Sequence, residues 1–125
     1  MAAEFDLVRS KWEARQGAPV LTTVDENGRP NSVYFTIGGF FDDHTFFIAD
    51  NFFHKTRKNI LLGTQASVLF LTPDRDSFQI KGSIHLETEG KIFEAMKYIN
   101  PHTLPGRAAA VVKIESIYSG AKRIL

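Results

Sequence analysis

The sequence contains no cysteine. This absence excludes disulfide bonds, thiolate catalysis, and the zinc and iron–sulfur sites that depend on cysteine ligands. The four histidines, His44, His54, His85 and His102, form neither a His-x-His nor a His-Glu-x-x-His pattern, so we predict no metal site. The chain also lacks the Gly-x-Ser-x-Gly motif of serine hydrolases and the glycine-rich motifs that hold nucleotide phosphates.

A large excess of charge is also missing. Fifteen basic and 14 acidic residues give a net charge of +1, so we expect no general attraction to nucleic acids or to anionic membranes. No apolar run approaches the roughly 20 residues of a membrane-spanning helix. The N-terminal residues, which include Glu4 and Asp6, do not have the pattern of a signal peptide. These features predict a soluble, cytoplasmic protein.

Apolar and aromatic residues are abundant. They include 11 phenylalanines, and 43% of the residues are hydrophobic. A chain of 125 residues can bury a substantial core within one domain. No internal repeat, low-complexity tract or linker divides the sequence, so we predict a single domain over residues 1–125.

The spacing of apolar residues predicts mainly strands, with a few short helices. Helical spacing covers residues 4–17, 55–62 and 91–100. Strand patterns cover residues 19–25, 29–38, 44–50, 64–73, 77–88 and 108–118. Asn27-Gly28 predicts the tip of a hairpin, "GGFFDD" predicts a second turn, and Gly82 predicts a bend or bulge within a long strand. Short strands joined by hairpins favour an antiparallel barrel, closed or nearly closed, with packed helices.

Two predicted strands are apolar on both faces. They contain Phe46-Phe47-Ile48-Ala49 and Val68-Leu69-Phe70-Leu71. One face of each strand can fill the barrel, but the other face must also be covered. In so small a protein we expect a second subunit to cover it, and therefore a homodimer.

A dense basic cluster, His54-Lys55-Thr56-Arg57-Lys58, opens the second predicted helix. Backbone N–H groups at a helix start, the Thr56 hydroxyl and the Lys55 ammonium could bind a phosphate group. The neighbouring Phe52 and Phe53 could cover a flat apolar group attached to it. The alternative is a helix start whose basic side chains only face water.

The polar face of the strand over residues 77–88 is a second candidate. Gln79 and Lys81 could hydrogen-bond a heterocycle or stabilise negative charge on it, or they could belong to an ordinary exposed face. Glu87 and Glu89 share a face and could act as paired carboxylates, or could form a solvated edge. Basic residues interleaved with phenylalanine also fit single-stranded nucleic acid, which the near-neutral net charge disfavours.

Three stretches, taken together, resemble the FMN-binding split barrels of the pyridoxamine 5'-phosphate oxidase-like group, especially its short FMN-binding proteins. They are "LTTVDENGRPNSVYF", "FFIADNFFHKTRKNIL" and "FQIKGSI". The first resembles the family's opening hairpin. The second resembles its strand, loop and helix with a Lys-Thr-x-x-Asn step, and the third its long strand with a basic residue before glycine. The resemblance extends from Val20 to about Val112.

This resemblance implies a mainly β fold, a Greek-key-like antiparallel split β-barrel of about six strands with two or three short helices. It also implies a homodimer with noncovalent FMN at the subunit interface. Lys55 and Thr56 would then hold the phosphate, and Gln79 and Lys81 would tune the N1 and O2 edge of the flavin. The remaining cofactor-binding residues would be Ser32, Val33, Tyr34 and Phe35 along the ribityl chain and ring, and Ala49, Asp50 and Asn51 beside the ring or phosphate.

The function that the resemblance implies is that of an oxidoreductase or an electron-transfer protein, with donor and acceptor left open and no catalytic acid or base identified. Pyridoxamine 5'-phosphate oxidases carry a C-terminal arginine-containing segment that holds the substrate phosphate. This chain ends in "YSGAKRIL", with Arg123 but no equivalent segment, so that oxidase activity is not expected. The alternatives are a deazaflavin, a haem ligated by His54 or His85, or a cofactor-free dimeric binding module.

Overall fold

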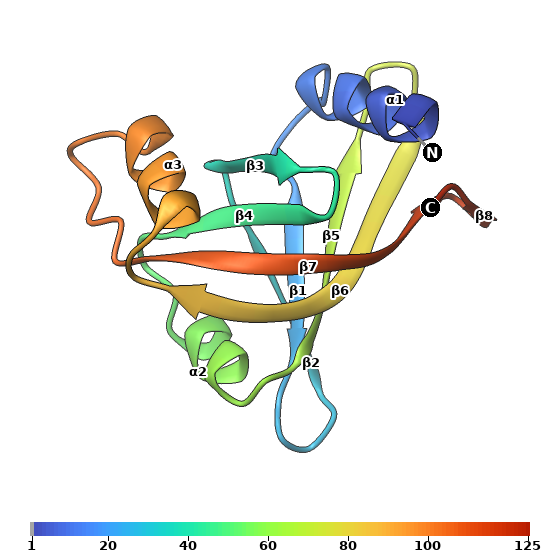
Figure 1. Cartoon of the computed structure of the whole chain (residues 1–125). Coiled ribbons are helices and arrows are strands. Elements are labelled where there is room, and N and C mark those ends of the chain that lie inside the picture. The colour runs from blue at the N-terminus through green and yellow to red at the C-terminus, as the bar shows by residue number, and fades with distance from the viewer. Residues whose placement is uncertain (1) are drawn as a thin grey trace.

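The computed structural model describes residues 2–125, which form eight strands and three helices. In chain order the elements are α1 (Ala2–Glu13), β1 (Val20–Val24), β2 (Pro30–Tyr34), β3 (Gly38–Asp42), β4 (Thr45–Asp50), α2 (Lys55–Leu61), β5 (Gln65–Leu71), β6 (Ser77–Glu87), α3 (Lys91–Ile99), β7 (Ala108–Ser119) and β8 (Lys122–Arg123) (Figure 1). None of the helices within residues 2–125 is long and apolar enough to cross a membrane.

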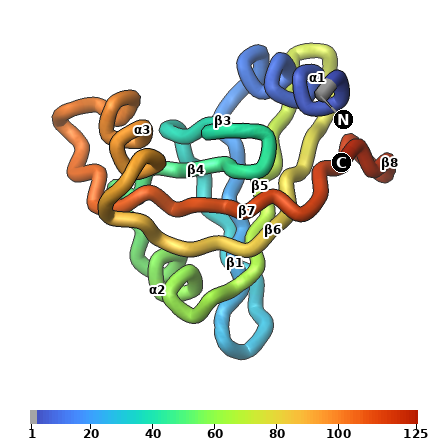
Figure 2. Tube along the Cα trace, in the orientation of Figure 1, coloured from blue at the N-terminus to red at the C-terminus, as the bar shows by residue number. Residues whose placement is uncertain are grey.

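All the strands belong to one antiparallel sheet. Its order is β2-β1-β5-β6-β7-β4-β3, and the short β8 pairs with β7. The long strand β6 curves strongly, so that the sheet wraps around its core (Figures 1 and 2). Within residues 2–125 no pairing joins the edge strands β2 and β3, so the sheet is not closed. The prediction of a mainly β, antiparallel fold with short helices is confirmed at this level.

The long pairing of β6 with β7 contains the predicted irregularity at Gly82. The register shifts between Lys81, which pairs with Ser116, and Gly82, which pairs with Ile114. A Cβ atom at Gly82 would lie only 1.8 Å from the carbonyl oxygen of Lys113. Glycine is therefore required here because the two backbones approach more closely than any side chain allows. The predicted bulge is confirmed.

The predicted hairpin at Asn27-Gly28 is also confirmed. Strands β1 and β2 pair up to Val24 and Pro30, and Gly28 has a φ of 78°. The Oδ1 atom of Asp25 accepts hydrogen bonds from the backbone N–H groups of Asn27 at 2.8 Å and Arg29 at 2.9 Å. An aspartate that bonds the backbone two residues further on is typical of a tight turn.

The prediction of a turn over "GGFFDD" was wrong for all but the last of these residues, because Gly38–Asp42 form β3 and pair with β4. The turn consists of Asp43 and His44, and the Oδ1 atom of Asp42 accepts a hydrogen bond from the N–H of His44. Gly38 serves close packing instead, because a Cβ atom there would lie 2.6 Å from the carbonyl oxygen of Phe47. With β3 and the short β8, the sheet exceeds the six strands that were predicted.

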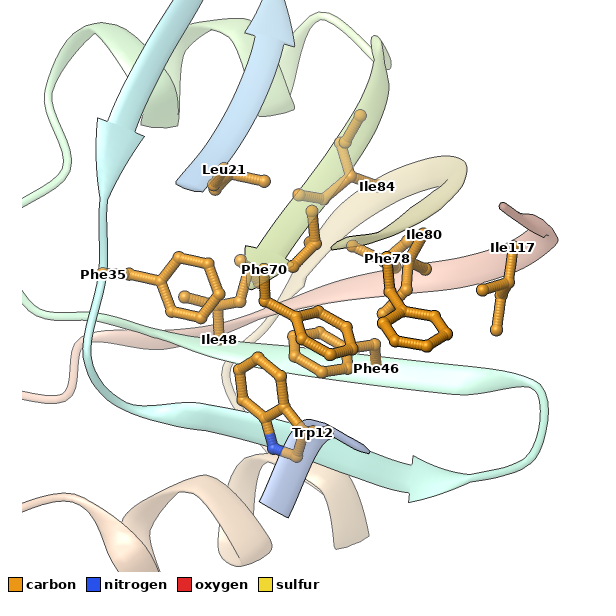
Figure 3. Packing of buried hydrophobic residues seen from close by; sticks show 14 of the residues in the cluster. Trp12, Leu21, Phe35, Phe46, Ile48, Phe70, Phe78, Ile80, Ile84 and Ile117 are labelled. Atoms are coloured by element: carbon orange, nitrogen blue, oxygen red, sulfur yellow. The ribbon is translucent and has the colours of Figure 1, made fainter. Parts of the chain in front are cut away.

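The core lies inside the wrapped sheet and is closed at one end by α1 (Figure 1). Trp12 points from α1 into the sheet, where its ring meets Phe46 at 4.9 Å and Phe70 at 5.2 Å between centroids, both nearly perpendicular (Figure 3). Edge-to-face pairs of this kind contribute about 0.5–1.5 kcal/mol each beyond the burial of their surface. The first helix therefore belongs to the core.

Strands β4 and β5, which are apolar on both faces, differ in whether the face that points away from the main core is covered. On β4, Phe47 and Ala49 pack against Met96 of α3, so this chain itself covers the face that was expected to need another subunit. On β5, Leu69 and Leu71 remain 43% and 46% exposed. Of these two strand faces, only that of β5 is left for a second subunit to cover.

Candidate functional site

A cavity of about 430 Å³ opens between the end of β2 and the end of β4, beside the start of α2. Most of its lining is apolar: Val33, Tyr34, Phe35, Ile37, Ala49, Phe52, Phe53 and Leu104. The polar lining consists of Asn31, Thr36, Asn51, His54, Lys55 and Thr56. A mainly apolar cavity of this size with a few polar groups is typical of a site for a small molecule or cofactor.

The cavity brings together seven of the eleven residues predicted from the sequence. They are Val33, Tyr34, Phe35, Ala49, Asn51, Lys55 and Thr56. These residues come from three separate segments of the chain, and the fold places them around one space. The other four, Ser32, Asp50, Gln79 and Lys81, do not line it.

Thr56 and Lys55, at the start of α2, line the cavity together with Asn31, and we call this group its polar end. The Thr56 side chain is only 2% exposed, and its Oγ1 atom accepts a hydrogen bond of 3.1 Å from Nδ2 of Asn31. Its hydroxyl proton can therefore point to an acceptor in the cavity. Lys55 is exposed at the rim and supplies a positive charge. Because α2 has only seven residues, an anion here would depend on these side chains more than on the helix dipole.

Asp50 lies behind the cavity wall and is completely buried. Its carboxylate accepts hydrogen bonds from Arg57 at 2.5 Å, Arg107 at 2.9 Å and the backbone N–H of Phe53 at 3.0 Å. Arg107 also donates to the carbonyl oxygen of Phe53 at 2.6 Å. This cluster fixes the segment 51–54, which carries Phe52, Phe53 and His54 to the cavity. Asp50 therefore supports the site without lining the cavity, and its predicted place beside the ring or phosphate stays a prediction.

Asn51 has two roles. It lines the cavity, and its amide forms a reciprocal pair of 3.0 Å hydrogen bonds with the amide of Asn100. Its Oδ1 atom also accepts a 2.8 Å hydrogen bond from the N–H of Gly106. These contacts hold the loop 100–107, which contributes Leu104 to the cavity. Asn100 and Arg107 were not predicted from the sequence, because no local pattern marks residues whose partners lie about 50 positions away.

The other predicted residues, Ser32, Gln79 and Lys81, lie outside the cavity lining. The hydroxyl oxygen of Ser32 lies 2.8 Å from that of Thr22, outside the cavity lining. Strand register places Tyr34, Val20, Leu69 and Gln79 in one row across four neighbouring strands. Gln79 is therefore separated from Tyr34 by two intervening strands, β1 and β5. The Nζ atom of Lys81 lies 4.9 Å from the ring centroid of Tyr118. Neither Gln79 nor Lys81 lines the cavity of its own chain, and their role stays a prediction.

The histidines are placed differently from one another. His54 lines the cavity, whereas Nε2 of His85 lies 2.7 Å from Oε2 of Glu87 on β6. Glu87, one member of the suggested carboxylate pair, thus has a histidine as its partner. In the part of the chain that the structure describes, no three His, Asp or Glu side chains are grouped to hold a metal ion.

Comparisons with solved structures agree on the fold. An FMN-binding protein from Syntrophomonas wolfei subsp. wolfei has a TM-score of 0.77 at 23% identity, over 94% of this chain and 86% of that one. The HupZ protein of Group A Streptococcus has a TM-score of 0.75 at 24% identity, over 95% and 92%. A heme binding protein from Mycobacterium smegmatis has a TM-score of 0.70 at 13% identity, over 93% and 53%. At these identities the likeness establishes the fold alone.

A comparison with protein-family models identifies the family of this chain, whereas a comparison with curated proteins gives no match. A family model described as pyridoxamine 5'-phosphate oxidase matches residues 9–119, which include the cavity and every strand from β1 to β7. The chain therefore belongs to the pyridoxamine 5'-phosphate oxidase family.

Proposed function

We propose that this protein binds FMN noncovalently and uses it in oxidoreduction or electron transfer. The observation that carries the proposal is the cavity itself, in which apolar and aromatic walls meet a polar end formed by Lys55 and Thr56. This arrangement suits a ligand with a flat apolar ring at one end and a phosphate at the other. A flavin would supply the redox chemistry, while the protein positions it and sets its electrostatic surroundings.

The residues present divide naturally between the two parts of such a ligand. Val33, Tyr34, Phe35 and Ala49 would contact the ring and ribityl chain, and Lys55 and Thr56 would contact the phosphate. A charge-assisted hydrogen bond contributes about 1.5–3 kcal/mol, whereas a micromolar ligand needs about 8 kcal/mol. The difference requires burial of roughly 200 Å² of apolar surface at about 25 cal/mol per Å². A ring held between the aromatic walls can supply this.

We also propose that the working form is a homodimer. Tyr34 and Phe52 line the cavity yet are 76% and 74% exposed, so the mouth of the cavity is framed by uncovered aromatic surface. Leu69 lies in the same cross-strand row as Tyr34 and Gln79, and a second copy packed on this face would cover it. Gln79 and Lys81 of one subunit would then reach the flavin of the other, which accounts for their distance from the cavity of their own chain.

A haem is the second candidate, because one structural neighbour is named a heme binding protein and His54 lines the cavity. In that case His54 would be the axial ligand. His85 is the weaker choice because its Nε2 atom is paired with Glu87.

The visible absorption spectrum of the freshly purified protein, with the released cofactor identified by mass, tests both candidates. A flavin spectrum with release of FMN supports the proposal. A haem spectrum that is lost in His54→Ala supports the second candidate, and the mass of a deazaflavin would replace FMN by that cofactor. A colourless protein that FMN titration does not colour contradicts a cofactor role altogether.

A further inference from the structure

A second cavity, of about 350 Å³, adjoins the first. It lies between the tip of the β1–β2 hairpin and α2, and it shares two lining residues with the first cavity, Asn31 and Lys55. Its other charged lining residues are Arg29, Lys58, Asp25 and Glu26. The two cavities therefore meet at the polar end of the proposed flavin site, next to the lysine assigned to the phosphate.

We infer that this second cavity holds the nucleoside end of a dinucleotide flavin, so that the protein accepts FAD as well as FMN. The inference rests on the proposed function, because it takes Lys55 as the residue that marks the phosphate. FAD differs from FMN by an adenylate group attached through that phosphate. Any such extension must leave the first cavity at its phosphate end, and the second cavity begins there.

The charges of the second cavity suit this extension. Lys55, Lys58 and Arg29 provide three positive charges against the two carboxylates of Asp25 and Glu26. The Asp25 carboxylate is held against the backbone of its own turn, where Oδ1 accepts hydrogen bonds from two N–H groups. Positive charges therefore outnumber negative ones by one in the lining, which suits a second phosphate.

The remaining groups suit the nucleoside. The planar guanidinium of Arg29 can stack on an adenine ring, and the carboxylate of Glu26 can accept hydrogen bonds from ribose hydroxyls.

The position of the cavity also distinguishes a cofactor extension from a separate nicotinamide donor. A nicotinamide ring must lie against the flavin ring to exchange a hydride with it. The second cavity shares no lining residue with the apolar wall formed by residues 33–37 and Ala49. It therefore adjoins the phosphate end and lies away from the ring end, which favours an extension of the flavin itself.

Calorimetric titration of the flavin-free full chain with FMN and with FAD tests the inference. We expect FAD to bind the wild-type protein no more than threefold more weakly than FMN. Lys58→Ala and Arg29→Ala should each weaken FAD binding about tenfold and change FMN binding less than twofold. Lys122→Ala, on β8 and outside both cavities, is the matched control and should change neither.

Three results would overturn the inference. The first is that FAD binds the wild-type protein more than threefold more weakly than FMN. The other two are that neither variant changes the affinity for FAD, or that the variants weaken the binding of FMN and FAD equally. If neither FMN nor FAD bound the wild-type chain, the proposed function would be refuted instead, and the inference with it. Arg29 and Lys58 are both exposed, so both variants should fold, and equal melting temperatures without ligand would verify this.

Discussion

The carboxylate of Asp50 has no exposed surface, and two arginines and a backbone N–H group bind it. Removing one member of a buried ion pair leaves the other charges uncompensated and typically destabilises a protein by about 3–5 kcal/mol. Because the side chains of Arg57 and Arg107 are 31% and 43% exposed, water can compensate part of this loss. Asp50→Asn should therefore lower the free energy of unfolding by about 2–3 kcal/mol, measured by urea denaturation.

Asp43→Asn is a matched control, since Asp43 is exposed in the turn after β3. It should change the free energy of unfolding by less than about 0.5 kcal/mol. If the two variants were equally stable, Asp50 would not have the structural role assigned to it.

Lys55 differs from Asp50 because it is exposed at the cavity and is assigned to the ligand. Lys55→Ala should weaken FMN binding about a hundredfold, which corresponds to one charge-assisted contact of ~3 kcal/mol. The melting temperature of the ligand-free protein should stay the same. Fluorescence titration with FMN measures the effect, and Lys58→Ala, which removes a lysine that lines only the second cavity, provides the comparison. Equal FMN affinity in Lys55→Ala and wild type would refute the role of Lys55.

At the scale of elements, local signals could be read from the sequence and distant partners could not. The β1–β2 hairpin was predictable because Asn27-Gly28 itself supplies the turn. Strand β3 was missed because Gly38-Gly39 and Asp42-Asp43 resemble turn residues, whereas Gly38 in fact allows close contact with β4. The cluster of Asp50 with Arg107 joins residues 57 positions apart, and a single sequence carries no signal for such a pair.

In the candidate site, too, local motifs could be predicted from the sequence and distant neighbours could not. Lys55 and Thr56 form a dense local motif, whereas the distance of Gln79 from the cavity depends on the register of four strands. That register was not predictable from one sequence.

The β1–β2 hairpin should depend on pH through Asp25. Backbone hydrogen bonds, chiefly from Arg29 and also from Asn27, hold the pKa of its carboxyl below the ordinary value of 3.8. A carboxyl with a lowered pKa stabilises the folded state above its unfolded pKa, and this contribution is lost as pH falls through the folded pKa. Asp25→Ala should therefore lower the melting temperature most above about pH 5, and the difference from wild type should narrow towards about pH 2.

Thermal melts followed by circular dichroism across this pH range measure the difference. Glu26→Ala, at the exposed neighbouring position, is the control and should show little dependence on pH. A difference for Asp25→Ala that stayed constant from neutral to acidic pH would contradict the assignment.

The bulge between β6 and β7 should tolerate no side chain at Gly82. In Gly82→Ala, the added Cβ atom would overlap the carbonyl oxygen of Lys113, so the strands would have to separate. Overpacking of this kind destabilises by about 1–3 kcal/mol or more, and we expect the upper end because backbone atoms must move. Chemical denaturation checks the value. Gly39→Ala is the control, because its Cβ would lie 3.7 Å from Trp12, an ordinary contact, and a loss as large as that of Gly82→Ala would contradict the argument.

At the scale of the whole molecule, the proposed dimer can be tested through β5. Sedimentation velocity should give a mass about twice the 14.1 kDa of the chain. Leu69→Lys places a charge on the exposed apolar face and should shift the protein to the monomer, with a parallel loss of FMN because the partner's side chains leave the site. Leu7→Lys, at an exposed leucine on α1, should leave the dimer intact. A wild-type protein that sediments as a monomer at micromolar concentration would refute the dimer.

The place of β7 in the sheet has a consequence for how the protein is made. This strand, over Ala108–Ser119, lies between β6 and β4 and is the only sheet neighbour that joins the group β2-β1-β5-β6 to the pair β4-β3 within residues 2–125. On the ribosome, both groups emerge before β7 and have no strand to connect them. Long-range pairings of this kind form slowly, and strand edges that are still unpaired are prone to aggregate. We therefore expect the two groups of strands to stay unpaired with each other until β7 has left the exit tunnel, so that the proposed flavin could bind only after that point.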